Sequence, residues 1–126
     1  MIFIIGGSYQ GKLDFARQHF ALQDSDIFIC AEDGPEIDFT RRCLAYVDRW
    51  ALKMVRNGEE PLEFFLQNEE ALKDAVVIAN DISCGVVPVD AQLRAWREAC
   101  GRLNNHLARQ AGEVWRLFCG LPQRVK

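Results

Sequence analysis

A glycine-rich segment between an apolar run and a helical pattern constrains this chain more than any other feature. Met1 to Ile5 form a continuous apolar, β-rich run, which is typical of a strand buried on both faces of a parallel sheet. Residues 6–11 break this run with three glycines, and residues 12–20 then place apolar side chains at helical spacing. A buried strand, a glycine-rich turn and a helix in this order indicate an α/β fold.

Apolar runs and helical patterns alternate along the rest of the chain. Further strands are expected at 26–30, 43–48, 75–79 and 113–119, with a short one at 123–126. Helices are expected at 49–56, from Pro61 onward, and from a cap at Asp90 to about residue 110. This order predicts a central, mostly parallel β-sheet flanked by helices. The length of 126 residues, without repeats or low-complexity linkers, predicts a single domain spanning 1–126.

Composition argues against several classes of protein. The net charge of −3, with basic residues spread along the chain, offers no electrostatic basis for binding nucleic acid or an anionic membrane. The apolar start is too short for a signal peptide or a membrane span. The five cysteines contain no C-x-x-C pair, so we expect reduced, mostly buried thiols in a cytoplasmic protein. They are Cys30, Cys43, Cys84, Cys100 and Cys119.

The glycine-rich segment has the spacing of a phosphate-binding loop. Its residues are Gly6, Gly7, Ser8, Tyr9, Gln10, Gly11 and Lys12, which match the Walker A pattern G-x4-G-K in its strand–loop–helix context. Glycines let successive N–H groups turn towards an anion, and the helix N-terminus adds free N–H groups and partial positive charge. Lys12 would supply a full charge for the β- and γ-phosphates of a nucleotide. This pattern predicts a P-loop NTPase-like fold; an ordinary βα turn with a surface lysine is the alternative.

One position departs from the Walker A pattern. The pattern has Ser or Thr after the lysine, because that hydroxyl ligates Mg²⁺. Here the residue is Leu13, which offers no oxygen to a hard cation. Asp14 lies about a hundred degrees further round the helix and is no direct substitute. The loop is therefore expected to hold phosphate, while its binding of a metal ion is weakened or moved to another position.

Two acids follow apolar runs and are candidates for catalysis. Asp48 and Asp81 are expected at the C-terminal edge of the sheet, beside the phosphates, where each could hold Mg²⁺ directly or through water. The alternative for each is a cap on the segment that follows. His19 and His106 are expected to be ordinary helix residues rather than nucleophiles.

Three segments of the second half carry a family resemblance. Residues 77–88 resemble a strand followed by Asn-Glu-Val-Gly-x-Gly-Ile-Val-Pro, and residues 94–105 resemble a helix with Arg-x-Phe-Arg-Asp-x-x-Gly-x-x-Asn-Gln. Residues 113–122 resemble a closing strand with a Gly-x-Pro turn. These motifs, with the N-terminal loop, are similar to the bifunctional adenosylcobinamide kinase / adenosylcobinamide-phosphate guanylyltransferase family of cobalamin biosynthesis. The chain looks like a shortened and divergent member.

The resemblance implies GTP or ATP as phosphate donor, a cobinamide-type corrinoid alcohol as acceptor, and a homo-oligomer, typically a trimer. Asp48 would stand where the family has a strand-end Glu, and Asn80-Asp81 where it has Asn-Glu. The family's guanylyl-accepting histidine lies between the second and third strands, where residues 31–42 contain none. The resemblance thus implies a P-loop kinase that has lost the guanylyltransferase step. A catalytically degenerate nucleotide-binding or assembly module, and a kinase for another small molecule, are the alternatives.

Overall fold

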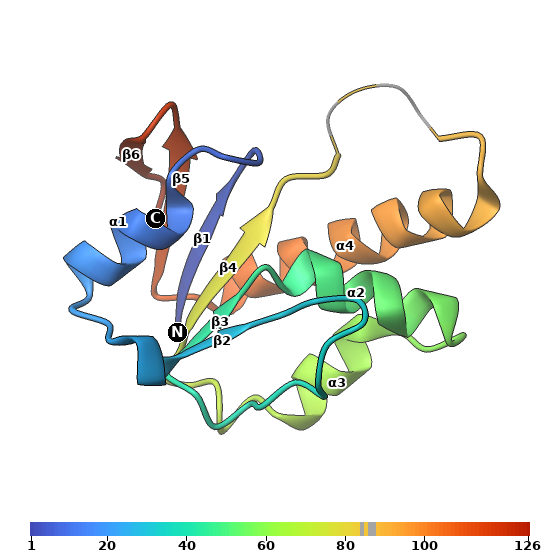
Figure 1. The fold of residues 1–126 in the computed structure, drawn as a ribbon, viewed down its shortest axis with the longest axis horizontal. Coiled ribbons are helices and arrows are strands. Elements are labelled where there is room, and N and C mark those ends of the chain that lie inside the picture. The colour runs from blue at the N-terminus through green and yellow to red at the C-terminus, as the bar shows by residue number, and fades with distance from the viewer. Residues whose placement is uncertain (84, 86–87) are drawn as a thin grey trace.

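The computed structural model describes residues 1–83, 85 and 88–126, so Cys84 and part of the 77–88 motif lie outside the described residues. These residues form a six-stranded sheet flanked by helices (Figure 1). The elements in chain order are β1 (Ile2–Gly6), α1 (Lys12–His19), the 3₁₀ turn η1 (Asp24–Asp26), β2 (Ile27–Ile29), β3 (Cys43–Ala45), α2 (Val47–Arg56), α3 (Pro61–Gln67), β4 (Val76–Asn80), α4 (Ala91–Gln110), β5 (Glu113–Phe118) and β6 (Leu121–Arg124).

The sheet has the strand order β2-β3-β4-β1-β5-β6, with β1 at its centre. Strands β1 to β5 pair in parallel, and Ile4 of β1 pairs with Ile78 of β4 and Trp115 of β5. Strand β6 pairs antiparallel to β5 and forms an edge, where Pro122 is tolerated because an edge strand need not donate every N–H group. The prediction of an α/β fold with a mostly parallel central sheet is confirmed.

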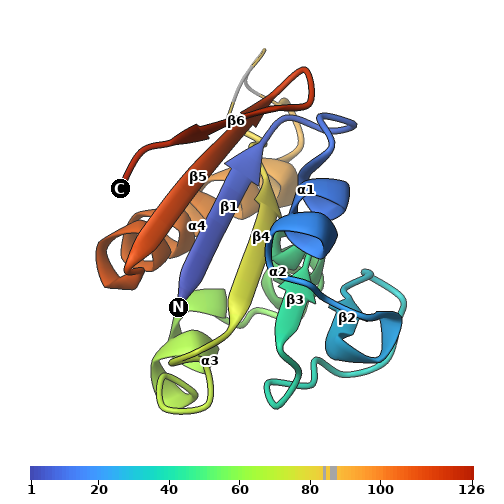
Figure 2. The same ribbon diagram turned by 90° about the vertical axis from the view of Figure 1, so that its left-hand side faces the viewer.

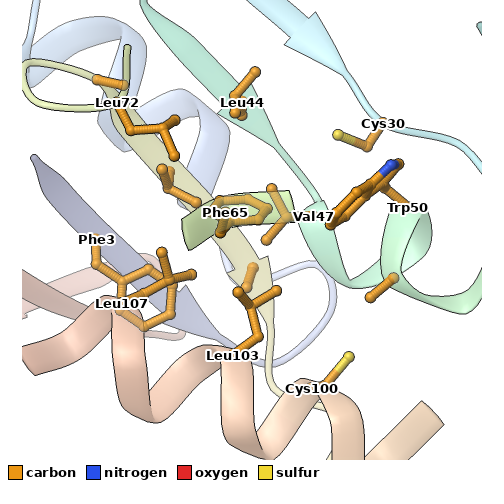
Figure 3. Close-up of a cluster of buried hydrophobic side chains, with 14 of the residues drawn as sticks. Phe3, Cys30, Leu44, Val47, Trp50, Phe65, Leu72, Cys100, Leu103 and Leu107 are labelled. Carbon is orange, nitrogen blue, oxygen red and sulfur yellow. The ribbon is translucent and has the colours of Figure 1, made fainter. Parts of the chain in front are cut away.

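The two faces of the sheet are covered unequally. Helices α2, α3 and α4 cover one face, and α1 lies on the other (Figures 1 and 2). In the larger core, Phe3 of β1 packs among Trp50 of α2, Phe65 of α3, and Leu103 and Leu107 of α4 (Figure 3). Alternate strand residues such as Ile4, Ile78 and Leu117 pack in a second core with Ala16 of α1. No helix in the described ranges is long and apolar enough to cross a membrane.

The starts of α3 and α4 were predicted correctly from capping signals. Pro61 occupies the first turn of α3, and the Asp90 side chain accepts a hydrogen bond of 3.0 Å from the Leu93 N–H group at the start of α4. The N–H groups in the first turn of a helix have no partner within the helix, and only a few residue types beside that turn suit them. A helix start can therefore be predicted from those residues in the sequence.

The strand predicted at 43–48 is wrong in its second half. Strand β3 ends at Ala45, and Tyr46 takes a left-handed conformation with φ 62° and ψ 49°. This residue turns the chain directly into α2, so Asp48 lies in the first turn of a helix and not at a strand end. A left-handed tyrosine is unfavourable for local steric reasons, and only the surrounding packing can hold it there.

Candidate functional site

The loop of residues 6–12 joins β1 to α1 at the edge of the sheet where the parallel strands end (Figure 1). Gly6 must be glycine, because a Cβ atom there would lie 2.5 Å from the Leu117 carbonyl oxygen of the neighbouring strand. Gly11 takes φ 84° and forms the N-cap of α1, a conformation that glycine adopts without strain. The glycines at both ends of the loop are therefore required by the backbone.

The loop presents free backbone N–H groups. Within the part of the chain that the structure describes, the N–H groups of residues 8–13 have no hydrogen-bond acceptor. The α1 helix begins within this range, so its partial positive charge coincides with the free donors. Such an arrangement suits a phosphate group, whose oxygens accept several hydrogen bonds at once.

The Lys12 side chain lies inside the loop. It is only 3% exposed, and its Nζ donates a hydrogen bond of 2.6 Å to the Gly7 carbonyl oxygen. Burial lowers the pKa of this ammonium group, the Asp48 carboxylate acts to raise it, and the Arg49 guanidinium lowers it further. The loop therefore surrounds a buried cation that an anion would stabilise.

The tip of the loop is attached to the turn between β5 and β6. The Gln10 carbonyl oxygen accepts a hydrogen bond of 3.1 Å from the Gly120 N–H group, and Gln10 Oε1 accepts one from the Cys119 N–H group. Figure 2 shows the two turns side by side. This attachment orients the loop, and the sequence contained no signal for it because the partners are 109 residues apart.

A cavity of about 370 Å³ opens beside the loop. It is lined by Ser8, Tyr9, Gln10, Gly11, Lys12, Leu13, Asp14, Tyr46, Arg49 and Asn80. Sequence reasoning missed two of these residues, Tyr46 and Arg49 at the start of α2, and it named Asn80 at the end of β4 only through the family resemblance. The sequence did place Arg49 next to the candidate Asp48, which was the available signal. The direction of the Arg49 side chain, however, depends on where α2 begins.

Asp48 is buried and fully engaged with Asn80. Its Oδ1 accepts a hydrogen bond of 2.8 Å from the Asn80 N–H group, and its Oδ2 accepts one of 3.2 Å from Asn80 Nδ2. The Asp48 carbonyl oxygen accepts a third, of 2.7 Å, from Trp96 Nε1. Asp48 thus connects α2 to β4 and α4, and it lines neither cavity beside the loop.

Asp81 lies on the other flank of the loop. It follows β4 directly, and its N–H group donates a hydrogen bond of 2.8 Å to the Gly6 carbonyl oxygen. Its side chain accepts a hydrogen bond from the Ser83 N–H group and helps to line a second cavity of about 280 Å³, together with Gly7 and Arg116. The structure therefore does not bring Asp48 and Asp81 together around one point.

The donors around the loop do not fit a magnesium ion held directly by Asp48 and Asp81. Leu13 has no oxygen, both oxygens of Asp48 accept hydrogen bonds from Asn80, and Asp81 faces a different cavity. Among the described residues, no group of three or more His, Cys, Asp and Glu side chains could hold a metal ion. Asp14, which is exposed, is the only carboxylate among the residues that line the 370 Å³ cavity.

Neither histidine contributes to these cavities. His19 stacks on Phe15, with ring centroids 5.0 Å apart, and contacts Trp115. The Nε2 atom of His106 lies 3.0 Å from a carboxylate oxygen of Glu69. Both residues lie near Met1, at the end of the sheet opposite the loop. The described residues thus place no imidazole beside the loop.

Comparisons with a family model and with individual known proteins point to the same family. The sequence model described as "Cobinamide kinase / cobinamide phosphate guanyltransferase" matches residues 43–125. Over 51 residues the chain is 35% identical to the bifunctional adenosylcobalamin biosynthesis protein CobU of Escherichia coli K12, and equally to that of Salmonella typhimurium LT2. These matches cover 40% of this chain but only 28% of each relative. The family match begins after the loop of residues 6–12, so the loop is identified by its own spacing and geometry.

Proposed function

The chain belongs to the cobinamide kinase / cobinamide phosphate guanyltransferase family, and on that premise we propose that it binds GTP or ATP at residues 6–12 and transfers the terminal phosphoryl group to the alcohol of a cobinamide-type corrinoid in cobalamin biosynthesis. The observation that carries this proposal is the buried Lys12 ammonium, 3% exposed, inside a loop whose N–H groups at residues 8–13 have no acceptor in the described structure. Residues 8–13, which carry this cation and these donors, also line the 370 Å³ cavity, which a polyphosphate would fill.

Each part of the loop would have a distinct role in phosphoryl transfer. The amides of Ser8 to Gly11 would hold the β-phosphate, and Lys12 would neutralise charge that develops on the transferring group. Asp48 would act through Asn80, because it positions that residue at the edge of the 370 Å³ cavity. Asp81 would lie on the acceptor side, in the cavity that shares Gly6, Gly7 and Gln10 with the loop.

The guanylyltransferase half of the family's activity is proposed to be lost. A covalent guanylyl intermediate needs a nucleophile beside the phosphates. Residues 31–42 contain no histidine, and neither His19 nor His106 lines a cavity at the loop. A homo-oligomer, with the trimer that the resemblance implies, and a cytoplasmic location complete the proposal.

A second candidate is a nucleotide-binding or assembly module of the same fold without turnover. Two observations favour it: Leu13 replaces the hydroxyl ligand, and Asp48 already uses both of its carboxylate oxygens. This candidate shares the nucleotide site with the first and differs only in the absence of product.

Calorimetric titration with GTP and ATP, followed by a product assay with adenosylcobinamide, tests both candidates. Lys12→Ala is expected to weaken nucleotide binding by about tenfold or more, because it removes a charge-assisted contact. Lys53→Ala is the matched control, since Lys53 pairs with Glu36 and lines neither loop cavity. Equal affinity of the Lys12→Ala variant and the wild type would contradict the nucleotide site. Binding without any phosphorylated product would favour the module over the kinase.

A further inference from the structure

The donors around Lys12 do not fit a magnesium ion, yet the same cavity contains a second cation. Arg49 lies in the first turn of α2 and lines the 370 Å³ cavity together with Lys12. Within the described ranges, no carboxylate forms an ion pair with Arg49. A charged side chain that faces a phosphate-sized cavity without a carboxylate partner is available to an anionic ligand.

The guanidinium group of Arg49 is held in place by a neighbouring ring. Its Cζ atom lies 4.5 Å from the centroid of the Tyr46 ring, within the range of a cation–π interaction. Tyr46 is itself fixed by its left-handed backbone, and its carbonyl oxygen accepts a hydrogen bond of 3.0 Å from the Arg49 N–H group. The ring contact restricts the Arg49 side chain before any ligand binds, which lowers the entropy cost of binding.

Two positive charges meet at this cavity. Lys12 and Arg49 both line the 370 Å³ cavity. Burial lowers the pKa of the Lys12 ammonium, the Asp48 carboxylate acts to raise it, and the Arg49 guanidinium lowers it further. Like charges that face one cavity favour a polyanion between them. The free N–H groups of residues 8–13 add donors on the same side.

We propose that Arg49 takes the place of the divalent cation at this site, so that Lys12, Arg49 and the loop amides bind the β- and γ-phosphates of a nucleotide without Mg²⁺. A guanidinium group suits this role because its planar fork can donate to two phosphate oxygens at once and stays charged at every physiological pH. The inference rests on the proposed nucleotide site and specifies its chemistry: a polyphosphate bound by protein cations.

The test is titration of ATP and of GTP, each in EDTA and each in excess Mg²⁺, against the wild-type protein and its Arg49→Gln variant. The wild type is expected to bind with affinities that agree within about threefold in the two conditions. Arg49→Gln is expected to lose about tenfold or more in EDTA, as for other charge-assisted hydrogen bonds. Arg56→Gln is the matched control, because Arg56 lies on the same helix, pairs with Glu32 and does not line the cavity.

Two further variants test whether the planar fork of Arg49 matters beyond its charge, and whether the Asp14 carboxylate contributes to binding. Arg49→Lys keeps the charge but loses the planar fork, so it is expected to recover only part of the affinity in EDTA. Asp14→Asn removes the only carboxylate that lines the cavity in the described structure, so it is expected to bind in EDTA at least as tightly as the wild type, because a negative charge beside the phosphates is lost. Because Arg49 is exposed, thermal melting of each variant is expected to match that of the wild type.

The outcomes distinguish this inference from the proposed function. Wild-type binding that requires Mg²⁺ and disappears in EDTA would overturn the inference alone. So would an Arg49→Gln variant that binds in EDTA as tightly as the wild type. A wild-type protein that binds neither nucleotide in either condition would overturn the proposed nucleotide site itself.

Discussion

At the scale of single residues, the site contains charges that the fold does not neutralise. Lys12 is buried with its ammonium bound to a backbone carbonyl group, and Arg49 adds a second positive charge to the same cavity. Asp48 is also buried, but it receives hydrogen bonds from Asn80 at both carboxylate oxygens. A buried charge without a full partner lowers stability, and proteins keep such a charge where a ligand uses it.

Replacement of Lys12 by methionine is expected to stabilise the unliganded protein near neutral pH. The pKa of Lys12 is lowered from 10.5 in the folded state, so the charged form opposes folding below the folded-state pKa. As the pH rises through that lowered pKa towards 10.5, the folded wild type loses the proton and the penalty disappears. Thermal melts of both proteins from pH 7 upward should therefore converge in the alkaline range.

The direction of the change in melting temperature tests this prediction. A Lys12→Met variant that melts below the wild type at every pH would show that the hydrogen bond to Gly7 outweighs the cost of burial. At the same nucleotide concentration, the variant should also be stabilised less than the wild type, which should melt at a higher temperature as nucleotide is added.

At the scale of elements, the β5–β6 hairpin contacts the loop of residues 6–12 and holds its tip, although the two segments are far apart in the sequence. Its turn residues Cys119 and Gly120 have φ angles of 49° and 76°, the positive values that a type I′ turn requires at both positions. The N–H groups of both residues donate to Gln10, so the geometry of this turn sets the position of the loop tip. The hairpin is therefore part of the site although none of its side chains lines the 370 Å³ cavity.

Replacement of Cys119 by asparagine is expected to raise the free energy of unfolding by up to about 1 kcal/mol. Asparagine adopts positive φ more readily than cysteine, and Asn-Gly is the favoured type I′ pair. The Cys119 backbone N–H group that donates to Gln10 is retained. Urea denaturation measures the change, with Cys119→Ser as control: if serine stabilises equally, loss of the thiol and not turn geometry is responsible.

At the scale of the whole molecule, the sheet separates two cores of different size. Cys30 and Cys100 lie in the core beneath α2, α3 and α4, and Cys43 lies in the core on the α1 side. Burial raises the pKa of each of these thiols to about 12. Cys119 is free and exposed at the hairpin turn. The chain thus carries a natural reporter in each core and one on the surface.

Alkylation at pH 8, followed by peptide mass spectrometry, is expected to modify Cys119 quickly and the three buried thiols slowly. A buried thiol with a pKa near 12 has almost no thiolate at this pH and reacts only when the protein opens. If both cores open together, the three buried cysteines should react at one common rate in increasing urea. Faster reaction of Cys43 than of Cys30 and Cys100 would show that α1 detaches before the rest unfolds.

Local physical rules account for what could be predicted from the sequence. A strand buried on both faces must be apolar throughout, which made β1 and β4 visible, and caps such as Asp90 and Pro61 marked helix starts. The loop was predictable because glycine is needed where backbone comes close to backbone, as at Gly6, or turns left-handed, as at Gly11. The patterns themselves are formed by residues within a few positions of one another, although the structural reason for Gly6 is its contact with the distant Leu117.

The amino-acid sequence by itself thus determined the α/β class, the central strands and the phosphate-type loop, since all of these follow from local patterns. Only the tertiary structure decided which side chains surround that loop. Packing holds Tyr46 in a left-handed turn, which starts α2 early, withdraws Asp48 to Asn80 and directs Arg49 into the cavity. Contacts between residues far apart in the chain select such a conformation against its local cost, so no local pattern encodes it.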